Sequence, residues 1–337
     1  MKITMLGTSG SGKTTFMGAM QNLFFKDNVN GYRLANRSSK YENGVFINKT
    51  FNATNDLYRR GKWPGGTGTS ALMQLEFRHW DERLLDIDWI DYRGEAITEL
   101  AEGIKKEGSS EILATLMFSD VILVFVDAAA LNAIKNDFIA RDYVGADAIS
   151  ELLSYIKAKR HIDVIFVLSK IDSSTISSKD LENLRMRVKK LYSNFMGSET
   201  SESYNSPIVE VGACNYGNVK TECEYIEELG YWTFEHKILS HNDLQPINVA
   251  STFALALLKC LESEINNKNT SANKIEQEVK NLEENFNGLK NFIDILCGSP
   301  KREYIFDMKK VILYSRDDIK KLEKHRPALE AIVKEKK

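Results

Sequence analysis

The sequence predicts an α/β fold in which a mostly parallel, twisted sheet is flanked by helices. Nearly continuous aliphatic runs, typical of strands covered on both faces, occur at residues 121–131 and 163–172. Segments with helical apolar spacing alternate with such runs, which indicates right-handed crossovers between parallel strands. A further apolar run, residues 2–6, leads directly into a glycine-rich loop.

This loop and the residues after it read GTSGSGKTT, residues 7–15. Its glycines permit backbone angles that a Cβ forbids, so amide N–H groups can surround a phosphate at the start of a helix. Lys13 would supply charge for the β- and γ-phosphates, and the Thr14 hydroxyl would coordinate Mg²⁺. The alternative, a flexible linker, is disfavoured by the preceding strand and by the helical spacing of residues 15–25. The expected nucleotide-binding residues here are Gly7, Ser9, Gly10, Ser11, Gly12, Lys13, Thr14 and Thr15.

The other elements of this P-loop NTPase fold follow in chain order. Residues 26–70 form a long polar connection, and long loops in compact domains are usually functional or disordered. Residues 71–80 and 84–91 form two adjacent strands, most simply a hairpin. The remaining pattern predicts helices over 95–118, 145–160, 178–195 and 248–265, and a strand over 207–214.

A change of composition predicts a second part of the chain. Residues 1–265 would form the nucleotide-binding domain, and the polar stretch NNKNTSANK, residues 266–274, would be a linker to an extension over 266–337. Within the extension, an apolar seam at heptad spacing predicts a helix over about 274–297. The seam consists of Ile275, Val279, Leu282, Phe286, Leu289, Ile293 and Leu296. The seam either packs on its own domain or serves a partner or self-association. A short strand over 304–314 and a helix over 317–337 complete the extension.

Composition narrows the choice of partners and compartment. The 337 residues carry a net charge of -2, which gives no bulk attraction to nucleic acid. The four cysteines are scattered without a paired spacing, so neither zinc nor a disulfide framework is indicated. No apolar run is long enough to span a bilayer, and the chain enters a strand at once without a signal peptide. We therefore expect a cytoplasmic protein with reduced thiols.

A second motif follows the hairpin, Asp91-Tyr92-Arg93-Gly94-Glu95. It stands where P-loop proteins place a carboxylate that coordinates Mg²⁺ and a glycine whose amide, here that of Gly94, senses the γ-phosphate. Asp91 is therefore an expected metal ligand. The alternative is a polar turn between strand and helix that uses glycine for backbone reasons.

A third motif decides the base. Ser169-Lys170-Ile171-Asp172 closes a buried strand, and the Asp172 carboxylate can accept two hydrogen bonds from guanine, whereas adenine offers no such donor pair. The Lys170 stem can lie along the base, and Ser169 would support the loop. Small residues at Gly212-Ala213-Cys214 would admit a backbone amide near the guanine O6. Alternatively, the third motif only caps the helix that follows Ser177.

Together these motifs resemble the P-loop GTPases of the TRAFAC class, over roughly residues 1–265. GTSGSGKT corresponds to the family's first motif, DYRG to the third, SKID to the fourth and GAC to the fifth. The long first switch with Trp63-Pro64-Gly65-Gly66-Thr67 is similar to bacterial double-GTPase proteins of multigene conflict and defence systems. The resemblance implies that Thr67, or else Thr69, reaches Mg²⁺ and the γ-phosphate.

Two departures from the family pattern affect the prediction. Ser169 replaces the usual Asn or Thr, and Glu95 replaces the glutamine that orients the attacking water in Ras-like members. A carboxylate beside the polyphosphate is repelled, so we expect slow hydrolysis. The expected catalytic residues are Lys13, Thr67, Arg93 and Glu95. Arg93, or alternatively Arg59 or Arg60, could act as an internal arginine finger, although such residues more often contact solvent or acidic partners.

The sequence thus predicts a Mg²⁺-dependent GTPase that binds GTP and GDP and gates a partner protein as a molecular switch. One alternative is a nucleotide-bound scaffold without useful catalysis, and another is a P-loop kinase or ATPase. The aromatic cluster of residues 231–234 favours core or helix packing over base stacking. None of the five histidines has a spacing that indicates a metal site or a catalytic triad.

Overall fold

The computed structural model describes residues 1–27, 29–37, 63, 71–91, 97, 113, 116–196, 206–227, 231–240, 245–286 and 300–335. The chain divides into two compact units. The first comprises Met1–Ala256 with Val333–Lys337, and the second comprises Leu257–Ile332. The predicted boundary at residues 265/266 therefore falls inside the second unit.

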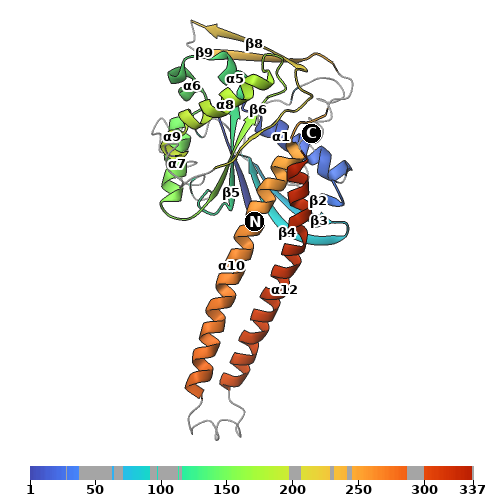
Figure 1. The fold of residues 1–337 in the computed structure, drawn as a ribbon, viewed down its shortest axis with the longest axis vertical. Coiled ribbons are helices and arrows are strands. Elements are labelled where there is room, and N and C mark those ends of the chain that lie inside the picture. Colours follow the sequence, from blue (N-terminus) through green and yellow to red (C-terminus); the bar gives the residue numbers. More distant parts are fainter. Residues whose placement is uncertain are drawn as a thin grey trace. The chain divides into compact units, whose positions relative to one another are not determined.

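Within the described residues, one seven-stranded sheet forms the centre of the first unit (Figure 1). Its order is β2-β3-β4-β1-β5-β6-β7. The strands are β1 (Lys2–Leu6), β2 (Tyr32–Asn36), β3 (Ala71–His79), β4 (Glu82–Asp91), β5 (Val121–Asp127), β6 (Asp163–Ser169) and β7 (Ile208–Glu210). The predicted fold class is confirmed, because β4, β1, β5, β6 and β7 run parallel.

The sheet brings the carboxyl ends of distant strands to one edge. β1 lies between β4 and β5, with Met5 paired to Asp91. β5 pairs with β6, and Asp127 lies opposite Ser169. Ligands in open α/β sheets bind beyond the carboxyl ends of the strands, so this edge positions the site.

Helices cover both faces of this sheet (Figure 1). Aliphatic residues of β5 and β6 form one core with α5 (Ala128–Ala133), α6 (Asp137–Tyr143), α7 (Ala146–Lys157), α8 (Ser178–Leu191) and α9 (Ser193–Met196). The other face carries α1 (Lys13–Gln21), the π-helical η1 (Asn22–Asp27) and the first turns of α10 (Val249–Phe286). There Phe253 contacts Trp89 and Phe24, with ring centroids 5.5 and 4.9 Å apart.

Several sequence-predicted bounds were wrong, for local physical reasons. The expected strand 121–131 ends at Asp127, because the Asp127 side chain accepts a hydrogen bond from the Ala130 amide and caps α5. The strand β2 occurs inside the connection 26–70, where no strand was expected. It forms because its alternate residues Tyr32 and Leu34 are buried and its backbone pairs with β3. The predicted hairpin of β3 and β4 is confirmed.

The sequence analysis also missed a second, two-stranded sheet. β8 (Val219–Ile226) pairs antiparallel with β9 (Tyr231–Ile238). We call this element the β8–β9 hairpin. An isolated bridge joins Ser173 to Val219, so β8 begins as an extension of the loop after β6.

The second unit contains the rest of α10 and α12 (Pro300–Lys334). These two long helices run antiparallel, side by side (Figure 1), and Lys268–Asp318 and Arg316–Glu276 ion pairs join them. Of the predicted seam, Ile275, Val279 and Leu282 pack with α12. Leu289, Ile293 and Leu296 lie outside the described residues.

Two predictions about the second unit were wrong. The expected linker 266–274 is helical, because α10 continues through it and buries Ala272. The expected strand 304–314 is part of α12. Met308 and Ile312 are buried at a spacing of four, which suits a helix packed on a second helix. Among the described helices, none is both long enough and apolar enough to cross a membrane.

Candidate nucleotide-binding site

The glycine-rich loop connects β1 to α1 through backbone conformations that favour glycine. Gly7, Gly10 and Gly12 have φ values of 149°, 74° and 93°. A Cβ at Gly7 would lie 2.7 Å from the Phe125 carbonyl oxygen of β5. The loop therefore needs glycine at this position both for its angles and for its close approach to the neighbouring strand.

Lys13 is the first residue of α1 and is 5% exposed. Its Nζ donates to the carbonyl oxygens of Gly7 at 2.7 Å and Thr8 at 3.0 Å, and to the Ser11 Oγ at 3.4 Å. These contacts hold the ammonium group across the loop, next to its backbone amides. The arrangement concentrates positive potential at the helix start, where an anion binds most favourably.

Ser169, at the end of β6, connects this loop to the third motif. Its Oγ donates to the Ser11 carbonyl oxygen at 2.6 Å, and it also lies 3.1 Å from the Val126 carbonyl oxygen. The loop passes close to this strand end, since a Cβ at Gly12 would be in van der Waals contact with the Ser169 Cβ, at 3.4 Å. Ser169 thus links the end of β6 to the glycine-rich loop.

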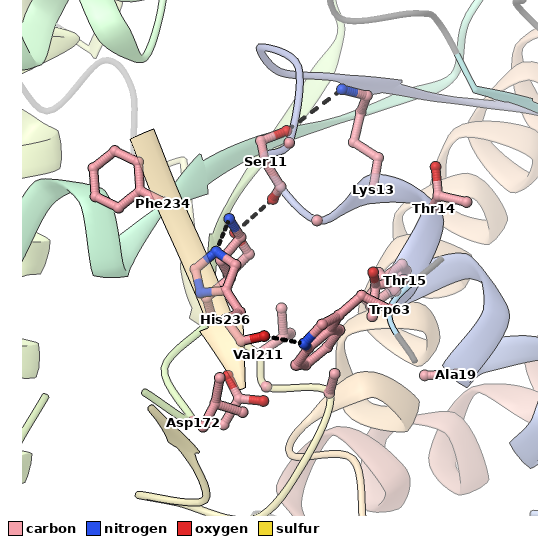
Figure 2. Close-up of a pocket in the computed structure, with 18 of the residues that line it drawn as sticks. Ser11, Lys13, Thr14, Thr15, Ala19, Trp63, Asp172, Val211, Phe234 and His236 are labelled. Carbon is pink, nitrogen blue, oxygen red and sulfur yellow. Dashed lines mark hydrogen bonds between the residues drawn. The ribbon is translucent and has the colours of Figure 1, made fainter. Parts of the chain in front are cut away.

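A cavity of about 300 Å³ extends from this loop toward Asp172 (Figure 2). Of the predicted site residues in the described chain, all but Gly7, Asp91 and Cys214 line it. It is also lined by Phe16, Ala19, Trp63, Tyr143, Val211, Gly212, Val219, Phe234, His236 and Val249. The glycine-rich loop occupies one end and Asp172 occupies the other, and after the groups they are expected to bind we call these the phosphate end and the base end.

Asp172 is 2% exposed, and its carboxylate accepts a hydrogen bond from the Cys214 amide at 2.9 Å. Burial raises the pKa of Asp172 to about 6, while hydrogen bonds from backbone amides oppose the rise. Cys214 does not line the cavity, although its amide orients Asp172 and burial raises the pKa of its thiol to about 12. The base end therefore presents an oriented carboxylate beside a neutral thiol.

Lys170 has a left-handed backbone conformation, with φ of 60°. Its Nζ forms an ion pair with Asp127 Oδ2 at 2.5 Å and a hydrogen bond with His236 Nε2 at 3.0 Å. The head group is thereby fixed at both sides, and the residue lines the cavity.

Sequence reasoning missed four ring-bearing residues that line the cavity. Phe234 packs on Tyr143 with ring centroids 5.2 Å apart, and both line the cavity. Trp63 and His236 line it as well. Phe234 and Trp232 also pack against the core, as expected, but the additional role of Phe234 was not foreseen. The signal was present: VKTECEYI and YWTFEHKI are strand-like runs separated by a short segment that contains Gly230.

Comparison with known proteins now identifies the family, because a model described as Double-GTPase 2 matches residues 2–213. The chain belongs to the Double-GTPase 2 family. It is thus a guanine-nucleotide-binding protein of a GTPase family. Among solved structures, the chain is similar to a chain of the signal recognition particle receptor SRb-GTP/SRX complex from Chaetomium thermophilum. That similarity has a TM-score of 0.34 and 12% identity, and it covers 64% of this chain and 95% of that chain. No curated protein sequence matches the chain.

Some predicted site residues of this Double-GTPase 2 protein lie outside the described residues. They are Arg59, Arg60, Thr67, Thr69, Arg93, Gly94 and Glu95. The backbone of Asp91 is described, and its pairing with Met5 places it next to the strand that leads into the glycine-rich loop. Among the described residues, no group of three or more His, Cys, Asp or Glu side chains could hold a metal ion by itself.

Proposed function

We propose that this protein binds GTP and GDP with Mg²⁺, hydrolyses GTP slowly, and uses the two nucleotide states to gate a partner protein. The observation that supports it best is the shared cavity, with the glycine-rich loop at one end and buried Asp172 at the other. A buried carboxylate without a guanine-type donor pair would be costly, and this favours guanine over adenine.

The residues around the phosphate end fit a magnesium ion. Mg²⁺ prefers oxygen ligands and keeps several waters, so one hydroxyl and one carboxylate are a suitable protein contribution. Thr14 lines the cavity at the start of α1, and the backbone of Asp91 is beside β1. We assign Thr14 and Asp91 as ligands, with Thr67, or else Thr69, joining them. When bound, the ion would neutralise charge between the β- and γ-phosphates.

Slow hydrolysis follows from the residue after Gly94. Glu95 stands where the resemblance to Ras-like members places the glutamine that orients water, and its charge opposes the approach to an anionic phosphate. Lys13 would stabilise the charge on the transferred phosphoryl group, and Arg93 would add to it as an internal finger.

We propose that the protein gates its partner through the residues around Thr67 and Asp91–Glu95, which the bound nucleotide would order. The extension over 266–337, with its helical seam, would be the surface for the partner, for assembly, or for self-association. From the resemblance to bacterial double-GTPase proteins, we further propose a role in a multigene defence system. The scattered cysteines and the net charge of -2 support a cytoplasmic protein without nucleic acid as a partner.

The first experiment measures equilibrium binding of GTP, GDP and ATP to the full chain, with and without Mg²⁺. We expect guanine nucleotides to bind at least about 100-fold more tightly than ATP, since the carboxylate accepts hydrogen bonds that adenine cannot donate. Equal binding of ATP and GTP would contradict the proposal and favour a P-loop kinase or ATPase.

The second experiment measures multiple-turnover phosphate release from GTP. Turnover far below about 1 s⁻¹, the lower end of ordinary enzyme rates, is expected. A rate near 1 s⁻¹ in the isolated protein would contradict slow hydrolysis, and complete absence of release would favour the scaffold.

A further inference from the structure

A chain of hydrogen bonds joins the β8–β9 hairpin to the base end of the cavity. Lys170 Nζ contacts His236 Nε2 at 3.0 Å, and His236 Nδ1 contacts Thr221 Oγ1 at 3.1 Å. Ser173 Oγ donates to the same Thr221 oxygen at 2.9 Å. The network therefore leaves the third motif at Lys170, crosses both strands of the hairpin, and returns to the residue after Asp172.

The protonation state of His236 follows from its neighbours. A lysine ammonium can only donate, so Nε2 must accept and the imidazole proton must lie on Nδ1, where it is directed at Thr221. Burial and the nearby Lys170 charge lower the pKa of His236 to about 4, although Asp127 opposes this. His236 is thus a neutral acceptor that shares the Lys170 head group with Asp127.

The backbone fixes the hairpin in the same place. The Val219 amide donates to the Asp172 carbonyl oxygen at 3.0 Å, and the Ser174 amide donates to the Val219 carbonyl oxygen at 2.7 Å. Any displacement of β8 would therefore move the backbone of Asp172 itself. The hairpin is built onto the base-binding loop, rather than being a separate surface element.

The hairpin also contributes to the wall of the cavity. The Trp63 indole donates to the His236 carbonyl oxygen at 2.7 Å, as Figure 2 shows, and its ring contacts the imidazole edge with centroids 6.2 Å apart. Phe234, two residues earlier on β9, lines the same cavity. One strand of the hairpin thus both holds Lys170 and carries the docking point for Trp63.

We propose that the β8–β9 hairpin is a recognition element of the nucleotide site, in which His236 positions Lys170 along the guanine base. This inference rests on the proposed function, since it assumes that the cavity holds a guanine nucleotide. His236 acts through Lys170 and does not itself touch the phosphates, so its effect is the same for GTP and GDP.

The test combines three variants with GDP and GTP binding. His236→Leu replaces the imidazole by an apolar side chain of similar bulk and removes the acceptor. We expect it to weaken both nucleotides about tenfold, the effect of one hydrogen bond to a charged group. His236→Gln keeps an acceptor for Lys170 and a donor for Thr221, and should bind within about twofold of wild type on the same argument. His161→Leu, which removes an exposed histidine, is the matched control and should bind as wild type does.

A double-mutant cycle separates positioning from general stability. In a Lys170→Met background, His236→Leu should cause less than about a twofold further loss, because contacting residues couple. A tenfold loss in both backgrounds, or a His236→Gln variant as weak as His236→Leu, would overturn the inference. If His236→Leu does not fold, Thr221→Val is used instead. This variant removes the acceptor for the Nδ1 proton, so the His236 tautomer that accepts from Lys170 is less favoured and a roughly threefold loss of affinity is expected. Unchanged affinity would overturn the inference.

The two proposals fail in different ways. A wild-type chain that binds no guanine nucleotide would overturn the proposed function and this inference together. A wild-type chain that prefers guanine, with His236→Leu binding equally well, would overturn only the role of the hairpin.

Discussion

The two ends of the nucleotide cavity are built in different ways. The phosphate end comes from nine consecutive residues, 7–15, held between one strand and one helix. The base end is assembled from separate segments: the loop after β6, the turn after β7, strand β9 and Trp63. A contiguous motif determines its own geometry, whereas a distributed site depends on the tertiary packing that brings its parts together.

This difference predicts that the two ends control different properties, namely affinity and base preference. In the proposed binding mode, the phosphate end would contact groups that every nucleoside triphosphate shares, so changes there should alter affinity without altering base preference. The base end would contact the base, which distinguishes GTP from ATP and XTP, so changes there should alter base preference. Three predictions test this division, from the largest effect to the smallest.

Asp172→Asn should change base preference most. The amide replaces one acceptor by a donor, which matches xanthine and opposes guanine, so the preference for GDP over XDP should fall on the order of 1000-fold. Competition binding of GDP and XDP to both proteins measures this ratio. An unchanged ratio would show that Asp172 only caps its loop and that the two ends do not differ as described.

Lys13→Met should weaken GDP and XDP alike. The variant removes a buried ammonium, and the loss of several charge-assisted hydrogen bonds should weaken binding about 100-fold with an unchanged ratio between the two bases. Isothermal titration with each nucleotide checks this. Lys179→Met, at an exposed position, is the control. A change in base preference in Lys13→Met would contradict the division.

Lower pH should affect the base end first. In the proposed binding mode guanine pairs with an ionised Asp172, and burial raises the pKa of this carboxyl to about 6. Because a bound guanine would stabilise the carboxylate, the affinity for GDP is highest above this pKa and decreases as the pH falls through it. GDP should bind roughly fourfold more weakly at pH 5.5 than at pH 7.5.

His236 does not contribute to the pH dependence between pH 5.5 and 7.5, because its pKa is lowered to about 4 and it stays neutral. Fluorescence titration of GDP at several pH values gives the curve, with Asp172→Asn as the control that should lack this component. A GDP affinity that is constant from pH 7.5 to 5.5 would contradict the role assigned to ionised Asp172.

The second unit shows where local residue composition predicts the wrong secondary structure. The run YIFDMKKVILY, residues 304–314, is rich in β-branched and aromatic residues and favoured a strand. In the structure it is helical, since Met308 and Ile312 face Val279 of α10 at helical spacing. The polar stretch 266–274 is helical for a related reason: Ala272 is buried, while the polar residues around it are mostly exposed.

The sequence by itself determined the fold class, the glycine-rich loop, the buried parallel strands and the identity of Asp172 as a candidate for base recognition. Each of these depends on neighbouring residues: glycine angles, aliphatic runs, and a polar residue directly after a strand. Tertiary structure decided the rest of the base end. His236 lies 66 residues from Lys170 and Trp63 lies 173 residues from His236, so no local pattern relates them. Their contacts exist only because β8 pairs with the loop that carries Asp172.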